Sequence, residues 1–169
     1  MSPRVVVVGM PASGKSTVGS HVAAALGVGF RDADEVIEAR TGKLIREIFS
    51  DDGEDAFRAI EEEVVLDLLA TFDGVVSLGG GSVLSPKVRA AVKDVPVVWL
   101  EVGVATATRR AGLNQLRPLL LGDVRTRMES LLAERSHLYE EVATIRLVTD
   151  RTSVTDLTQA IVTALEESR

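Results

Sequence analysis

The sequence lacks several features that would point to common classes of protein. It contains no cysteine, so disulfides and cysteine–zinc sites are excluded. Its two histidines, His21 and His137, are far apart in the chain, which makes a histidine metal site a poor interpretation. No block of basic residues occurs and the formal net charge is −6, so we expect no nucleic-acid partner.

Long hydrophobic runs are also absent. The longest apolar stretches are far too short to cross a bilayer, so we expect no membrane partner. A strand is predicted almost at the N-terminus, which leaves no room for a signal peptide, and we expect a cytoplasmic protein. The chain has 169 residues, of which 46% are hydrophobic and 26% charged. These values are typical of a single globular domain, 1–169, and we expect a monomer.

A glycine-rich segment near the N-terminus carries the most informative motif. It matches the phosphate-binding loop pattern G-x-x-x-x-G-K-[ST] at Gly9, Gly14, Lys15 and Ser16. A β-branched run at 4–8 precedes it and a helical pattern at 16–26 follows, which is the order that nucleotide binding requires. Lys15 would reach the β- and γ-phosphates, and Ser16 would bind Mg²⁺. The alternative is a plain glycine turn between a strand and a helix.

Two carboxylates follow the second predicted strand, 28–31. Asp32 and Asp34 project to the same side of an extended chain, and at the end of a parallel strand they would face a ligand crevice. Taken alone, the pair favours a simpler interpretation, in which Asp34 caps the helix that begins at Glu35. The phosphate-binding loop reverses this preference, because it needs a partner for Mg²⁺ and a group that orients the nucleophile.

Three glycines follow the third predicted strand, 75–78. Gly79, Gly80 and Gly81 would be costly in chain entropy, and they make sense where the backbone must approach a ligand or another element closely. A glycine-rich turn without such a role is the alternative.

Two arginines have ordinary explanations when each is considered alone. Arg58 lies near the start of a helix predicted from Glu54 to about Leu69. It could form a surface ion pair with a glutamate three or four residues away, at Glu54, Glu61 or Glu62. Arg135 lies late in a helix predicted over 123–139, where a cation would interact favourably with the helix dipole.

The segment 111–120 lacks clean periodicity and carries one cation, Arg117. It is predicted to be a mobile loop, because a kinase needs a lid that excludes water from the transferring phosphoryl group. The alternative is an ordinary connection between two helices, for which the segment is rather long.

The remaining pattern predicts the fold class. Further strands are expected at 97–100, with Trp99 in the core, and at 144–148. Five strands alternating with helices predict an α/β fold in which helices cover both faces of a parallel sheet, in three αβα layers.

The motifs together resemble those of the shikimate kinases, a family of the nucleoside-monophosphate-kinase-like P-loop group, and look most like actinobacterial members. The likeness covers nearly the whole chain. It rests on GMPASGKST (9–17), RDAD (31–34), FR (57–58), LGGGSV (78–83), RPLL (117–120) and ERSHLYEEVA (134–143).

The resemblance implies a fold and an activity. It implies the sheet order 2-3-1-4-5, a shikimate-binding region at about 32–62 and a lid at about 112–124. The implied reaction transfers the γ-phosphoryl group of ATP to the 3-hydroxyl of shikimate, in the chorismate pathway of aromatic amino-acid biosynthesis.

The resemblance also implies roles for individual residues. ATP would be bound by Ala12, Ser13, Gly14, Lys15, Ser16, Thr17, Arg110 and Arg117. Mg²⁺ would be bound by Ser16 and Asp32, and shikimate by Asp34, Arg58, Gly79, Gly80, Gly81 and Arg135. The catalytic residues would be Lys15, Asp34 and Arg117, with Asp34 orienting or deprotonating the attacking hydroxyl.

Three positions depart from the family's pattern. Ala12 stands where a glycine is common, an exchange that is tolerated if its φ is negative. Residues 152–154 replace a frequent proline beside adenine, which leaves that contact open. No acidic residue follows the third strand, so Asp32 must serve the magnesium. The alternatives are another small-metabolite kinase, such as a gluconate kinase, and a nucleotide-dependent binding module without turnover.

Overall fold

The computed structural model describes residues 2–112 and 121–168. Its centre is one all-parallel sheet with the strand order β2-β3-β1-β4-β5, which confirms the predicted fold class and order. The strands are β1 (Val5–Val8), β2 (Gly29–Asp32), β3 (Gly74–Ser77), β4 (Val97–Glu101) and β5 (Ile145–Val148).

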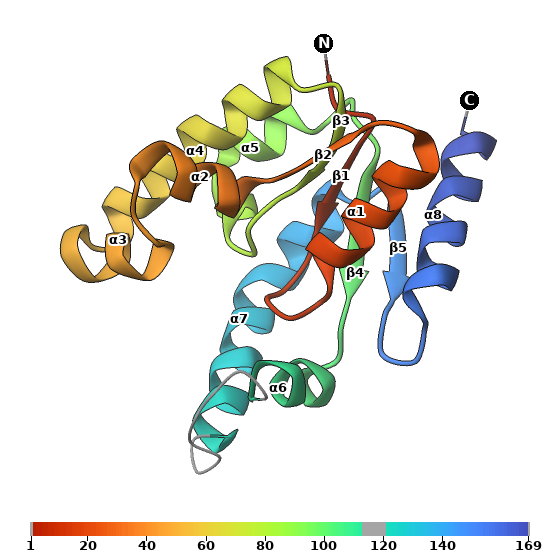
Figure 1. The fold of residues 1–169 in the computed structure, drawn as a ribbon. Helices are drawn as coiled ribbons and strands as arrows, with labels where there is room; N and C mark the ends of the chain where they lie inside the picture. Colours follow the sequence, from red (N-terminus) through yellow and green to blue (C-terminus); the bar gives the residue numbers. More distant parts are fainter. Residues whose placement is uncertain (1, 113–120, 169) are drawn as a thin grey trace.

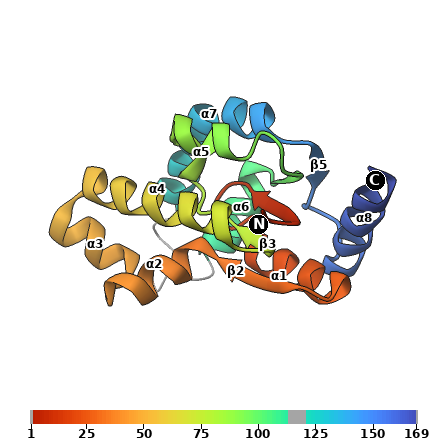
Figure 2. The ribbon, with the colours of Figure 1, turned by 90° about the horizontal axis from the view of Figure 1, so that it is seen from above.

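Helices connect the strands and cover both faces of the sheet (Figure 1). They are α1 (Lys15–Leu26), α2 (Ala33–Thr41), α3 (Ile45–Asp52), α4 (Glu54–Thr71), α5 (Pro86–Ala91), α6 (Val104–Gly112), α7 (Leu121–Val142) and α8 (Val154–Glu167), with a 3₁₀ turn, η1 (Ser82–Leu84). Seen from above, α1 and α8 lie on one side of the sheet, and α5 and α7 on the other (Figure 2). Among the described residues, none of the helices combines the length and apolarity needed to span a membrane.

Strand β1 shows why the layers form. Val6 and Val8 point into a larger core with α4, α5 and α7, whereas Val5 and Val7 point into a smaller core with α1 and α8. All four valines are almost completely buried, as a β-branched strand in the middle of a parallel sheet should be. Trp99 of β4 is 3% exposed, which confirms its predicted place in the core.

The helices on either side of 113–120 are longer than predicted. Ala111 and Gly112, the first two residues of the predicted loop 111–120, belong to α6, and α7 begins at Leu121 rather than at the predicted Asp123. Helix α7 also continues to Val142 rather than ending near Tyr139. The interpretation of Arg135 as a cation at the helix C-terminus is therefore wrong. The rest of the predicted lid, with Arg117, lies outside the described residues.

The sheet order sets the location of the site. Ser77, at the end of β3, is in register with Val7 of β1 on one side and with Asp32 of β2 on the other. The segments that follow these three strands therefore meet at one edge of the sheet, where parallel α/β proteins bind their ligands.

Candidate active site

The glycine-rich loop runs from the end of β1 into the N-terminus of α1. A Cβ at Gly9 would lie 2.6 Å from the carbonyl oxygen of Leu100, so only glycine fits there. Gly14 adopts a left-handed conformation, with φ of 89°, and α1 begins at the next residue. The loop thus presents the free N–H groups of a helix N-terminus, which favour an anion.

Ala12 does not have the negative φ that would make it an easy replacement for glycine. Its φ is +66°, and it is the one non-glycine residue with positive φ in the described part of the chain. A left-handed conformation costs an L-amino acid roughly 1–2 kcal/mol. The carbonyl oxygen of Ala12 accepts a hydrogen bond from Arg110 Nη1 at 3.1 Å.

Lys15 extends back along the loop. Its Nζ donates a hydrogen bond to the carbonyl oxygen of Met10 at 3.0 Å. Burial lowers the pKa of Lys15 to about 8, although the nearby Asp34 and Asp32 act in the opposite direction. An ammonium group that is partly stripped of water is well suited to bind phosphate oxygens.

Asp32 connects the loop to α2. Its Oδ1 accepts hydrogen bonds from the N–H groups of Asp34 at 2.9 Å and Glu35 at 3.4 Å, so Asp32 is the N-cap of α2. The alternative that Asp34 is merely the cap of this helix is therefore wrong. The other carboxylate oxygen of Asp32 accepts a hydrogen bond from the hydroxyl of Ser16.

The contact between Ser16 and Asp32 fits a magnesium ion. A hydroxyl and a carboxylate are hard oxygen ligands, and Mg²⁺ usually takes only one or two protein carboxylates and keeps several waters. The described residues contain no group of three or more acidic, histidine or cysteine side chains that could form a complete metal cage. The residues present suit a magnesium ion shared with phosphate oxygens.

Asp34 lies in the same cavity as Lys15. This acidic cavity has a volume of about 280 Å³ and is lined by Pro11, Ala12, Gly14, Lys15, Ser16, Thr17, Asp32, Asp34, Ser77 and Leu78. Burial raises the pKa of Asp34 to about 6, and the negative charges of Asp32 and Glu61 add to the effect. A carboxylate with this pKa is ionised at neutral pH and can accept a proton.

Each of the three glycines after β3 makes room for a side chain that the sequence predicts to bind substrate. A Cβ at Gly79 would lie 2.7 Å from Asp34 Oδ1, and one at Gly80 would lie 3.2 Å from Arg135 Nη1. A Cβ at Gly81 would overlap the guanidinium group of Arg58. None of these glycines has a positive φ, so they are needed for space rather than for conformation. The close approach that the sequence suggested is present.

The partner of Arg58 is a buried carboxylate. Arg58 Nη1 donates to Glu61 Oε1 at 2.8 Å, and Glu61, which is 3% exposed, also accepts a hydrogen bond from the Ser82 hydroxyl at 3.1 Å. The prediction that Arg58 pairs with a nearby glutamate is therefore right. The prediction that this pair lies at the surface is wrong, because Glu61 is buried. The ion pair fixes the direction of the arginine at the glycine segment.

Arg135 reaches the site from helix α7. It is 7% exposed, and its Nε has no hydrogen-bond partner among the described residues. Tyr139, one turn further along α7, is completely buried and donates a hydrogen bond to the carbonyl oxygen of Gly80 at 2.5 Å. Burial raises the pKa of Tyr139 to about 12, so its hydroxyl remains a donor. Helix α7 and the glycine segment are thereby fixed to each other.

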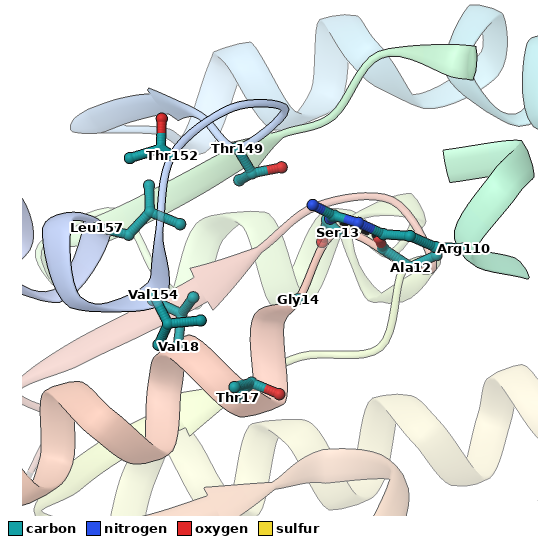
Figure 3. Close-up of a pocket in the computed structure, with 10 residues that line it drawn as sticks. All are labelled: Ala12, Ser13, Gly14, Thr17, Val18, Arg110, Thr149, Thr152, Val154 and Leu157. Carbon is teal, nitrogen blue, oxygen red and sulfur yellow. Dashed lines mark hydrogen bonds between the residues drawn. The ribbon is translucent and has the colours of Figure 1, made fainter. Parts of the chain in front are cut away.

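A second cavity lies on the other side of the loop (Figure 3). This apolar cavity has a volume of about 300 Å³ and is lined by Ala12, Ser13, Gly14, Thr17, Val18, Arg110, Thr149, Thr152, Val154 and Leu157. Arg110 lies on one side of it, facing the apolar side chains of Val18, Val154 and Leu157. A flat aromatic base could lie between a guanidinium and such a surface.

Comparison with known proteins decides the family. The family model described as shikimate kinase matches residues 11–166. The chain belongs to the shikimate kinase family. The shikimate kinase of Mycobacterium avium (strain 104) is 52% identical over 166 residues, which cover 98% of this chain and 94% of the relative. That of Mycobacterium tuberculosis (strain CDC 1551 / Oshkosh) is 53% identical over 152 residues, covering 89% and 86%.

Solved structures of shikimate kinases agree with this assignment. The enzyme from Acinetobacter baumannii, in complex with shikimate, has a TM-score of 0.91 and 33% identity and covers 100% of this chain and 95% of its own. The Aquifex aeolicus enzyme has a TM-score of 0.84 and 30% identity, with coverage of 98% and 97%. A gluconokinase from Sinorhizobium meliloti, at 19% identity and a TM-score of 0.62, shows a shared fold alone. The chain is thus an ATP-dependent small-molecule kinase, as predicted.

The fold gathers most of the residues that the sequence singled out. The loop residues, Asp32 and Asp34 line one cavity, and Arg58 and Arg135 meet at the glycine segment beside Asp34. Arg110 lies at the apolar cavity, as do Thr152 and Val154, which stand where the family frequently has a proline. Arg117 cannot be placed with them because it lies outside the described residues.

The structure adds residues that the sequence reasoning missed. The sequence analysis predicts Glu61 only as a surface partner of Arg58. Glu61 nevertheless lies on the same helical stripe as the apolar Phe57 and Val64, which is a signal of burial. Tyr139 is four residues after Arg135 and so shares its helix face. No sequence signal marked Thr149, which lines the apolar cavity and is 2% exposed.

Proposed function

We propose that this chain transfers the γ-phosphoryl group of ATP to the 3-hydroxyl of shikimate, giving shikimate 3-phosphate and ADP, in the cytoplasm. One observation carries the proposal. Asp34, Arg58 and Arg135, from three separate elements, each pack against one glycine of 79–81, directly beside the phosphate-binding loop. Two cations and a carboxylate in this arrangement suit a small acid that carries several hydroxyls.

The two arginines bind the carboxylate of shikimate. A guanidinium group is planar and can donate two parallel hydrogen bonds to a carboxylate, so Arg58 and Arg135 both orient the substrate and neutralise its charge. Glu61 holds Arg58 in place through the 2.8 Å ion pair. The buried Arg135 forms no ion pair with an acidic side chain of the described residues, which leaves its charge available to the substrate.

The loop binds the phosphates of ATP. Its N–H groups and the Lys15 ammonium stabilise the negative charge on the transferring group, and the adenine base occupies the apolar cavity beside Arg110. Ser16 and Asp32 would hold Mg²⁺, which would supply positive charge at the phosphate oxygens. The predicted role of Arg117 at the phosphates stays a prediction, because this residue lies outside the described residues.

Asp34 directs the nucleophile. Its carboxylate accepts a hydrogen bond from the 3-hydroxyl of shikimate and takes the proton as the new oxygen–phosphorus bond forms and the bond to ADP breaks. Its pKa of about 6 keeps it ionised at neutral pH. Catalysis therefore depends mostly on positioning and on charge stabilisation.

A coupled assay of ADP release tests the proposed function. We expect ADP release that depends on shikimate, and only background rates with gluconate or nucleoside monophosphates. Lys15→Ala should abolish turnover and leave the fold intact by circular dichroism. Arg58→Ala and Arg135→Ala should raise the KM for shikimate at least tenfold and leave ATP binding unchanged. Equal rates with gluconate, or no turnover with any acceptor, would contradict the proposal.

A further inference from the structure

One hydrogen bond joins the phosphate-binding loop to the last turn of α6. Arg110 Nη1 donates to the carbonyl oxygen of Ala12 at 3.1 Å, between residues that are 98 positions apart in the chain. Figure 3 shows the Arg110 side chain extending along the loop at Ala12 and Ser13. Arg110 therefore contacts the backbone of the loop as well as lining the cavity that we assign to the base.

Ala12, which accepts this hydrogen bond, is also the residue with a strained backbone conformation. Residues 10–13 form a turn in which the N–H of Ser13 donates to the carbonyl oxygen of Met10 at 3.2 Å, and Pro11 and Ala12 are the two central residues. A turn with Pro at the first central position and a positive φ at the second is of type II, and its second central position normally needs glycine. Ala12 adopts φ of +66° there, against the steric preference of its Cβ.

The geometry of this turn also sets the position of Lys15. The carbonyl oxygen of Met10 accepts both from the Ser13 N–H and from Lys15 Nζ, the latter at 3.0 Å. The peptide between Ala12 and Ser13 is planar and trans, so fixing the Ala12 carbonyl fixes the direction of the Ser13 N–H. The hydrogen bond to the Ala12 carbonyl therefore also influences the position of Lys15, because Ser13 and Lys15 both donate to the carbonyl oxygen of Met10.

We propose that Arg110 is a positioning residue of the phosphate-binding loop. Its hydrogen bond to the Ala12 carbonyl holds Ala12 in the left-handed conformation, and so keeps the turn and Lys15 in the geometry that binds the phosphates. This role rests on the proposed function only in that the loop binds ATP. It is independent of any contact between Arg110 and the base, and it arises because this chain has alanine, rather than glycine, at position 12.

A ligand without a base separates this role from base recognition. The test measures the dissociation constants of Mg·ATP and of magnesium tripolyphosphate by calorimetry, on the full chain without shikimate. The variants are Arg110→Ala, Ala12→Gly and their combination. Arg109→Ala, the exposed neighbour on α6, is the control for loss of one positive charge. Thermal unfolding checks that each variant is folded at the temperature of the titration.

We expect the effect of Arg110→Ala on tripolyphosphate binding to depend on which residue occupies position 12. Arg110→Ala should weaken tripolyphosphate binding about fivefold, the value of one hydrogen bond, and Arg109→Ala should leave it within twofold. Ala12→Gly should bind at least as tightly as the unmodified chain, because glycine adopts this φ without strain. When Arg110→Ala is added to the Ala12→Gly variant, its effect on tripolyphosphate binding should fall below about twofold.

Two results would overturn the proposal. If Arg110→Ala weakens ATP binding but not tripolyphosphate binding, Arg110 acts on the base alone. If its effect is the same with alanine and with glycine at position 12, it does not act through the strain at Ala12. Both results are obtained without an acceptor, so a failure of the shikimate assay leaves this test intact, and the reverse also holds.

Discussion

The charge that Asp34 needs for its proposed role in catalysis is a charge that its surroundings disfavour. Burial and the charges of Asp32 and Glu61 raise its pKa to about 6, from an ordinary value of 3.8. A carboxyl whose pKa is raised on folding favours the folded state below its ordinary pKa, and this contribution is lost as the pH rises through 6. At neutral pH, therefore, the ionised Asp34 destabilises the ligand-free protein.

Asp34→Asn should accordingly increase stability and remove activity. The amide keeps the shape of the side chain without its charge, so we expect the free energy of unfolding at pH 7.5 to rise by about 1–2 kcal/mol. Urea unfolding of the ligand-free protein measures this. The exposed Asp94→Asn is the matched control and should change stability by less than about 0.5 kcal/mol. A destabilised Asp34→Asn variant would contradict the assigned environment.

The pH dependence of turnover follows from Asp34 and Lys15. The value of kcat/KM should fall below about pH 6, as Asp34 takes up a proton, and above about pH 8, as Lys15 loses one. In kcat at saturating ATP, the alkaline limb should move to higher pH, because the bound phosphates favour the ammonium form. Initial rates across pH 5–10 test this. An acid limb near pH 4 would rule out Asp34 as the titrating group.

At the scale of elements, the glycine segment 79–81 organises the side of the site at which we propose that shikimate binds. It is fixed to α7 by the Tyr139 hydroxyl and to α4 through the hydrogen bond between Ser82 and Glu61. Its missing side chains create the space that Asp34, Arg135 and Arg58 fill. The segment is therefore as much a part of the proposed binding site as the charged groups themselves.

Gly81→Ala should damage shikimate binding without unfolding the protein. The added methyl group meets the flexible end of Arg58 rather than backbone, and Gly81 has φ of −100°, so the cost falls on the arginine. We expect the KM for shikimate to rise about tenfold, with the KM for ATP and the melting temperature nearly unchanged. On an Arg58→Ala background, Gly81→Ala should have little further effect. Additive losses would show that the methyl group acts by another route.

The sequence predicts the elements better than the environments of single residues. Short apolar runs place every strand to within one residue at either end, because the strands of a parallel sheet are buried on both faces. The left-handed conformation of Ala12 depends on the turn at residues 10–13, which the sequence pattern does not reveal. The capping role of Asp32 depends on the exact residue at which α2 begins. The burial of Glu61 depends on α4 packing against η1, a contact between distant parts of the chain.

At the scale of the molecule, the strand order brings the site together. Because β3 lies between β1 and β2, the phosphate-binding loop, the two aspartates and the glycine segment become neighbours. Helices α4, α6 and α7 add one arginine each, Arg58, Arg110 and Arg135. Motifs alone could identify these residues. Their convergence depends on the order of the strands in the sheet, and that order is predicted by the family resemblance rather than by the motifs.

The position of the transferred phosphate tests the central proposal most directly. Wild-type protein, ATP, Mg²⁺ and shikimate are incubated together, and the product is examined by phosphorus and proton NMR. We predict a single phosphate ester whose phosphorus couples to the proton on carbon 3 of shikimate, and no such product with Asp34→Asn. A phosphate on another hydroxyl, or ADP formed while shikimate remains unmodified, would contradict the proposed roles of Asp34, Arg58 and Arg135.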